Sequence, residues 1–115
     1  MSRHDEALLS DIVEAVAAIR AHLTRGDLHD GLVYDAVRVR LIEMGEAVKG
    51  IDPDLLEGAS GVPWKEIARM RDHLAHHYFD TDHAIVQDVV DNDLGSLAEA
   101  VQSLIDQINR DDASA

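Results

Sequence analysis

The sequence predicts an all-α fold, an antiparallel bundle of four to five helices in a single domain that spans residues 1–115. Aromatic residues make up only 3% of the chain, so the core must be built from aliphatic side chains, which suits helices packed on helices. Apolar residues recur at spacings of three and four over most of the chain, as they do on one face of a helix. A chain of 115 residues has room for one core but not for two.

Two long helices are expected in the first half of the chain. The first runs from Asp5 to Arg25, and Gly26 is expected to cap its C-terminus. Its apolar face has the helical spacing of Leu8, Ile12, Ala15, Val16, Ile19 and Leu23. The second is expected to begin at Asp30, a favourable N-cap residue. Its apolar stripe consists of Val33, Val37, Leu41, Met44, Val48 and Ile51.

The second predicted helix also has an apolar outer side, formed by Leu32, Ala36, Val39 and Ile42. A helix with two apolar faces lies in the centre of a bundle or between its own core and a second subunit. Near the middle of this helix, Gly45 costs about 1 kcal/mol relative to alanine. We expect that it permits a close crossing of another helix.

The second half of the chain begins with a glycine-rich segment. Residues 50–62 contain three glycines and a proline, so we expect the longest loop there, with one short turn around residues 54–57. Pro63 suits the first turn of a third helix, and Glu66 complements its positive end. Residues 80–82 are expected to cap a last helical segment over residues 82–109, with a kink or break at residues 92–96. Residues 110–115 are expected to fray.

The net charge of −13 argues against a nucleic-acid partner, because carboxylates repel phosphates. The distribution of the charge weakens this argument. Residues 38–71 hold six of the ten basic side chains, balanced by six acidic ones. If the protein contacts RNA, we expect the contact in this part of the chain.

The composition excludes several other classes of site. Cysteine is absent, which excludes disulfides and thiolate zinc ligands. No apolar run approaches the roughly 18 residues of a membrane span, and the N-terminus lacks the pattern of a secretory leader. We therefore expect a cytoplasmic protein without membrane association.

The third predicted helix carries an arginine within its apolar stripe. Trp64, Ile67, Arg71, Leu74 and Tyr78 share one face, so Arg71 stands where the pattern requires an apolar residue. Because arginine stays protonated, its guanidinium needs a paired anion, a bound phosphate or an aqueous cleft.

Two explanations of Arg71 remain open at this point. One is a salt bridge to a carboxylate of the second helix, with Glu43 and Glu46 as candidates. The other is a phosphate site that also uses His76. On a straight helix, His76 lies about 140° around the axis from Arg71. Cooperation therefore requires that the helix unwind near His76, or that a two-fold dimer bring Arg71 of one subunit toward His76 of the other.

The sequence around these residues resembles a known family. The block MRDHLAHHYFDTD at residues 70–82 is preceded by VPWKEI at residues 62–67 and by AVRVRLIEMGEAVK at residues 36–49. In this order the three blocks resemble the HepT-like branch of the HEPN superfamily. The Arg-x4-His-x-Tyr signature of that branch reads here as Arg71, His76 and Tyr78.

The resemblance implies an activity and partners. Proteins of this branch are helical dimers that act as metal-independent endoribonucleases, the toxins of toxin–antitoxin pairs of the type VII kind. Their antitoxin is a nucleotidyltransferase of the MNT type, which silences the toxin by attaching AMP to the motif tyrosine, here Tyr78. We therefore expect an RNA substrate and a homodimer that can form a larger hetero-oligomer with the antitoxin.

Residue chemistry agrees with this activity. Metal-free RNA cleavage needs a base for the 2′-hydroxyl proton and a cation for the charge of the transition state. Imidazole titrates near neutral pH and suits the first role, and the forked guanidinium suits the second. We assign His76 as the general base or acid, Arg71 as the phosphate clamp and Asp72 as a group that orients one of them. Asp72 departs from the family, which often has asparagine there, and its carboxylate could weaken RNA binding.

Other interpretations of these residues stay open. His73 and His77 lie one helical turn apart, with His83 nearby, a spacing that can hold zinc or nickel. Simpler roles are a solvated helix surface for the first two and a cap for His83. Tyr78 could merely close the apolar stripe. The domain could also bind nucleotides or a partner protein without turnover, or be a purely structural dimer.

Overall fold

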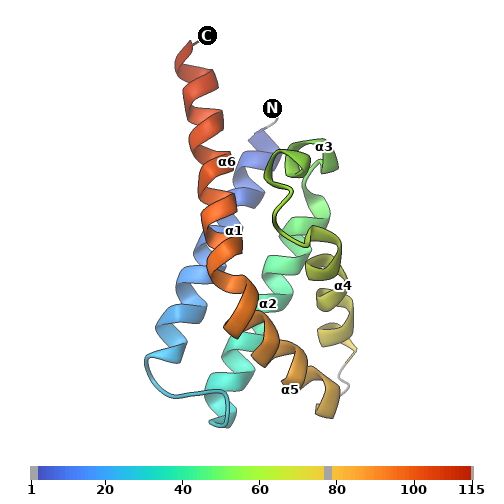
Figure 1. Cartoon of the computed structure of the whole chain (residues 1–115). Coiled ribbons are helices and arrows are strands. Elements are labelled where there is room, and N and C mark those ends of the chain that lie inside the picture. Colours follow the sequence, from blue (N-terminus) through green and yellow to red (C-terminus); the bar gives the residue numbers. More distant parts are fainter. Residues whose placement is uncertain (1–2, 77–78, 115) are drawn as a thin grey trace.

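The computed structural model describes residues 3–76 and 79–114, and it confirms the all-α prediction, since every regular element in these ranges is helical (Figure 1). Helices α1 and α2 run antiparallel, α4 packs on α2, and α6 packs on α1. No helix in these ranges is long and apolar enough to cross a membrane. The elements are α1 (Arg3–Leu23), α2 (Gly31–Gly50), α3 (Pro53–Leu56), η1 (Glu57–Ala59), α4 (Trp64–Ala75), α5 (Phe79–Asp88), η2 (Val89–Asp93) and α6 (Leu94–Ser114).

The core lies between α1, α2, α4 and α6 and is aliphatic, as predicted. All six residues of the predicted α2 stripe are buried. The predicted apolar face of α1 is buried except at its two ends, where Leu8 and Leu23 are only partly covered. Leu9, which was not among the predicted residues, is fully buried. On the other side of α2, Leu32 is 83% exposed and Val39 is also exposed, so a single chain leaves part of its apolar outer side uncovered.

Helix α2 begins as predicted, and α1 ends differently. The Asp30 carboxylate accepts hydrogen bonds from the backbone N–H groups of Leu32 and Val33, at 2.9 and 3.2 Å. The predicted cap at Gly26 is wrong, because α1 ends at Leu23 and the backbone of Gly26 is not left-handed. The Thr24 hydroxyl donates instead to a carbonyl of the last helical turn at 2.6 Å, so that turn is closed without a left-handed residue.

Helix α4 crosses α2 closely at Gly45, which confirms the predicted role of this glycine. A Cβ atom at position 45 would lie only 2.4 Å from Cβ of Arg71 and 3.2 Å from the carbonyl oxygen of Ile67. No side chain other than that of glycine fits there without moving the backbone of one helix. Gly45 therefore sets how closely Arg71 approaches α2.

The segment between α2 and α4 is more regular than predicted. It contains the expected short turn as α3, followed by η1. Asp52 caps α3 by accepting the N–H of Asp54 at 3.0 Å. The N–H of Asp52 is in turn bound at 3.2 Å by Asp5, a buried carboxylate of α1. Pro63 is the N-cap of α4, one residue before its predicted place in the first turn.

The last three elements form one continuous bent helix rather than a helix with a break (Figure 1). The predicted cap at residues 80–82 is wrong, because α5 begins at Phe79 and these residues lie in its first turn. The predicted kink is the π-helical turn η2, whose wider winding accommodates the bend without breaking the chain of hydrogen bonds. Residues 110–114, where fraying was predicted, form the last turn of α6, which ends at Ser114.

Candidate active site

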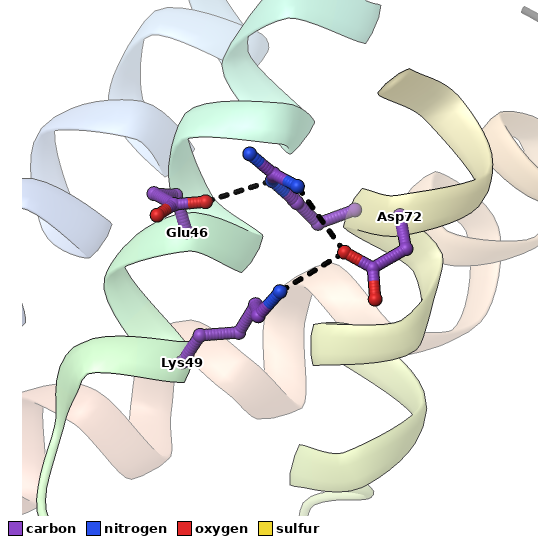
Figure 2. A network of polar contacts seen from close by, with 4 residues as sticks. Glu46, Lys49 and Asp72 are labelled. Atoms are coloured by element: carbon purple, nitrogen blue, oxygen red, sulfur yellow. Dashed lines mark hydrogen bonds and ion pairs between the residues drawn. The ribbon is translucent and has the colours of Figure 1, made fainter. Parts of the chain in front are cut away.

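Arg71 lies where α4 crosses α2, and its guanidinium is paired with carboxylates from both helices. Its Nε is 2.7 Å from Oε2 of Glu46, and its Nη1 is 3.2 Å from Oδ1 of Asp72. Figure 2 shows Glu46 projecting from α2 toward this network and Asp72 reaching it from α4. Of the two predicted glutamate partners, Glu46 is the one observed. Glu43 instead pairs with Arg40, at 3.0 Å.

Asp72 connects Arg71 to Lys49, a basic residue that the sequence analysis did not assign to the site. Lys49 Nζ lies 3.0 Å from the same carboxylate oxygen that contacts Arg71. Hydrogen bonds from Lys49 and then Arg71 lower the pKa of Asp72, so its carboxylate stays ionised. Lys49 follows Glu46 by three residues on α2, a spacing that places both on one face and could have indicated their shared role.

The network holds Arg71 without enclosing it. The Arg71 side chain is 32% exposed, and Glu46 and Asp72 are about half exposed or more. Although Nε is buried, its hydrogen makes no well-aligned hydrogen bond, so the Glu46 contact is mainly charge attraction. Exposed ion pairs contribute only about 0–1 kcal/mol each. An incoming phosphate could therefore displace either carboxylate at little cost.

His76 stands at the end of α4. The helix ends at Ala75, and His76 is its exposed C-cap, with its N–H bound to the carbonyl of His73 at 3.2 Å. The end of the helix at this point meets one of the two conditions under which His76 could cooperate with Arg71. The ion-pair and hydrogen-bond partners of Arg71 do not include His76, so their cooperation stays a prediction, as does the two-fold dimer. Tyr78 and His77 lie outside the described residues.

The other histidines have separate environments. His73 is exposed on α4. The predicted cap at His83 is wrong, because His83 lies inside α5 and its Nε2 is 3.0 Å from the carbonyl oxygen of Leu28. Its ring also stacks on that of Tyr34, with centroids 5.1 Å apart. In the part of the chain that the structure describes, no three His, Asp or Glu side chains are grouped as metal ligands.

A second arginine, Arg38, lies near the same end of α4 and was missed by the sequence analysis. Its Nε is 3.7 Å from Oδ2 of Asp82 on α5, and its Nη2 donates to the backbone carbonyl of Leu74. Arg38 and Asp82 are 13% and 2% exposed. Arg38 follows the buried Tyr34 by four residues and precedes the buried Leu41 by three, a spacing that could have indicated an inward-facing charge.

Comparison with known proteins identifies the family. A model of the family described as Ribonuclease HepT-like matches residues 9–104. The chain belongs to the HepT-like ribonuclease family. This confirms the resemblance seen in the sequence, and the matched range of this HepT-like chain includes Arg71, Asp72 and His76. No solved structure matches the chain significantly.

Three relatives of this HepT-like chain carry names that describe ribonucleases. A protein of Thermococcus cleftensis named Probable ribonuclease HepT is 34% identical over 90% of this chain and 98% of its own length. Two proteins of Methanocaldococcus jannaschii are named as candidate RNases. One is 35% identical over 76% of this chain and 73% of its own length, and the other is 30% identical over 98% and 97%.

Proposed function

We propose that this HepT-like chain is a metal-independent endoribonuclease and the toxin of a toxin–antitoxin pair, with Arg71 as the phosphate clamp. The observation that carries the proposal is the setting of Arg71. The crossing at Gly45 fixes its helix closely against α2, yet the two carboxylates paired with its guanidinium, those of Glu46 and Asp72, are 61% and 48% exposed. Such a cation is held in place and still accessible to a phosphate of RNA.

The cleavage step follows the chemistry of the 2′-hydroxyl. A general base removes its proton, the 2′-oxygen attacks the adjacent phosphorus, and the 5′-oxygen leaves with a proton supplied by an acid. The products are a 2′,3′-cyclic phosphate and a 5′-hydroxyl. In the proposal His76 is the base or the acid, Arg71 stabilises the charge on the phosphoryl oxygens, and Asp72 orients Arg71 through its contact with Nη1.

We include a homodimer in the proposal. The outer side of α2 supports it, because Leu32 and Val39 remain exposed in a single chain and apolar patches on one helix face commonly mark interfaces. A two-fold dimer could also bring His76 of one subunit to Arg71 of the other.

The antitoxin is proposed to be a nucleotidyltransferase of the MNT type that transfers AMP to Tyr78. Its support is the family and the place of Tyr78, two residues after His76 in the motif. A nucleotide attached there would add bulk and negative charge beside the proposed phosphate site, which opposes RNA binding.

The first prediction tests the assigned roles by RNA cleavage in the presence of EDTA. Arg71→Ala and His76→Ala should each lower kcat roughly 100-fold or more, because each removes a group that acts in the transition state. Arg69→Ala is the matched control, since Arg69 is an exposed arginine of the same helix. It should change kcat less than about threefold. Mass spectrometry of the products should find a 2′,3′-cyclic phosphate.

Two results would contradict this assignment. Either variant could cleave RNA at the rate of the parent, or EDTA could abolish cleavage and added metal restore it. A second candidate function, a catalytically weak module that binds a nucleotide or partner protein, is favoured by the neutralisation of Arg71 by Glu46 and Asp72. It predicts no cleavage by the parent, together with calorimetric AMP or antitoxin binding that Arg71→Ala abolishes.

A further inference from the structure

Arg38 on α2 makes contacts that reach two other elements. Its Nε is paired with Asp82 in the first turn of α5, and its Nη2 donates to the carbonyl of Leu74 in the last turn of α4. The carbonyl groups in the last turn of a helix receive no hydrogen bond from within that helix, and a cation placed there stabilises the negative end of the helix dipole. Arg38 therefore holds the end of α4 and the beginning of α5 at the same time.

The pair is buried at a cost. Asp82 is 2% exposed, and its Oδ1 has no hydrogen-bond partner among the residues that the structure describes. A buried carboxylate oxygen without a donor is unfavourable, and apolar side chains of similar volume commonly give equal or better stability than a buried ion pair. Stability alone therefore does not account for an arginine and an aspartate at these positions.

The surroundings of the pair fix it further. The pKa of Tyr34 is raised mainly by burial and further by the negative charge of Asp82, so the Tyr34 hydroxyl stays neutral. The ring of Tyr34 stacks on His83, the residue after Asp82. Arg38 follows Tyr34 by four residues, one turn along the same face of α2. The contact between α2 and α5 therefore combines an ion pair, Arg38 with Asp82, and a ring stack, Tyr34 on His83.

The position of these contacts in the sequence links them to the proposed active site. Leu74 lies two residues before His76, and Asp82 lies four residues after Tyr78. Arg71 is on the same helix as Leu74, about one turn earlier. The contacts of Arg38 therefore fix the points at which the chain enters and leaves the segment that contains both motif residues.

We propose that Arg38 and Asp82 are a positioning pair that sets where His76 stands relative to Arg71 during RNA cleavage. This inference rests on the proposed ribonuclease function, and neither residue is expected to touch RNA. Loss of the pair should lower kcat, because the acid or base is displaced from the reacting atoms. The KM for RNA should change little, since Arg71 and the exposed basic residues remain.

The test compares two double variants of the full chain, each of which replaces one arginine–carboxylate pair by apolar side chains. Arg38→Met/Asp82→Leu removes the buried pair. Arg40→Met/Glu43→Leu is the matched control, because it removes an exposed pair from the same helix and leaves the same net charge. Thermal midpoints of both should stay within about 5 °C of the parent. The first should lose roughly 10- to 100-fold in kcat with KM within about threefold, and the control should keep both.

Amide hydrogen exchange separates this inference from the ribonuclease function. In Arg38→Met/Asp82→Leu, amides of residues 73–76 and 82–85 should exchange at least about tenfold faster, while those in the middle of α1 are unchanged. If the parent cleaves no RNA but exchange changes in this way, the tethering by Arg38 holds and the nuclease proposal fails. If the double variant does not fold, Asp82→Asn, which keeps the shape of the side chain, replaces it in both measurements. Parental kcat together with parental exchange rates would overturn the positioning pair.

Discussion

Among the single residues, Asp72 has the most direct effect on the charge of the proposed phosphate site. Its carboxylate contacts both Arg71 and Lys49, and those contacts lower its pKa. At neutral pH it therefore places a full negative charge between two cations that would otherwise face RNA. An asparagine at this position would keep the size of the side chain and remove the charge.

We expect Asp72→Asn to bind RNA more tightly. Replacing the carboxylate frees Arg71 and Lys49 for phosphates, so the Kd for a 2′-O-methylated, uncleavable RNA should fall roughly three- to tenfold at low salt, and less at high salt. Asp11→Asn is the control for net charge, because it removes an exposed carboxylate of α1. It should change the Kd by less than about twofold. An unchanged or weaker Kd for Asp72→Asn would show that the carboxylate does not oppose RNA.

The same substitution should alter the dependence of stability on pH. Because the pKa of Asp72 is lower in the folded than in the unfolded chain, its ion pairs stabilise the fold above the unfolded pKa. That contribution is lost as the pH falls through the folded pKa. Thermal midpoints of the parent and Asp72→Asn should thus differ at neutral pH and converge in acid, and a constant difference would contradict this reading of the ion pairs.

Among the elements, α2 organises the molecule through three sides. Its buried stripe joins α1, Gly45 receives α4, and Arg38 reaches α5. Its fourth side carries the exposed Leu32 and Val39, which in the proposal contact a second subunit.

Val39→Glu should convert a dimer into a monomer, because a carboxylate in an apolar interface loses its water without gaining a partner. Light scattering after size-exclusion chromatography measures the mass. Ala7→Glu, at an exposed position of α1, is the control and should leave the mass unchanged. A parent that is monomeric at all concentrations, or a Val39→Glu protein that stays dimeric, would exclude this face as the interface.

Mixing Arg71→Ala with His76→Ala protein asks whether the active site is shared between subunits. If Arg71 of one subunit works with His76 of the other, half of the dimers are mixed and each has one intact site, so about a quarter of the parental activity should return. If the two residues work within one subunit, a mixed dimer has no intact site and no activity returns.

At the scale of the whole molecule, the net charge of −13 fits a protein whose access to RNA is local rather than electrostatic over long range. At the α2–α4 crossing, Arg71 and Lys49 place two partly exposed basic groups on the same carboxylate, that of Asp72. A partner that covers or modifies this region would control all contact with RNA.

Coexpression with the adjacent nucleotidyltransferase tests this control. Expressed alone, the chain should stop growth and degrade RNA, and coexpression should restore growth. The intact mass should then increase by one or more AMP groups, and Tyr78→Phe, which keeps the ring but lacks the acceptor oxygen, should not gain mass. A gain that survives Tyr78→Phe would move the modification to another residue, and growth without inhibition would argue against a toxin.

The sequence by itself determined the fold class, the stripe of α2, its N-cap and the need for a close crossing at Gly45. These features depend on residues that are neighbours in sequence or that recur every three and four residues, and both patterns are visible in the sequence itself. It also singled out Arg71 as a charge that required a partner. The sequence also predicted a kink or a break at residues 92–96, and of these two alternatives the structure has the kink, a π-helical turn at residues 89–93.

Only the tertiary structure decided which groups meet. Glu43 and Glu46 were equal candidates in the sequence, and the close crossing of α4 and α2 at Gly45 brings Glu46 to Arg71 and Lys49 to Asp72. Arg38 and Asp82 are 44 residues apart, and nothing local indicates that they pair. Their contact depends on how α2 and α5 pack, and packing between distant segments is a property of the folded chain rather than of any stretch of its sequence.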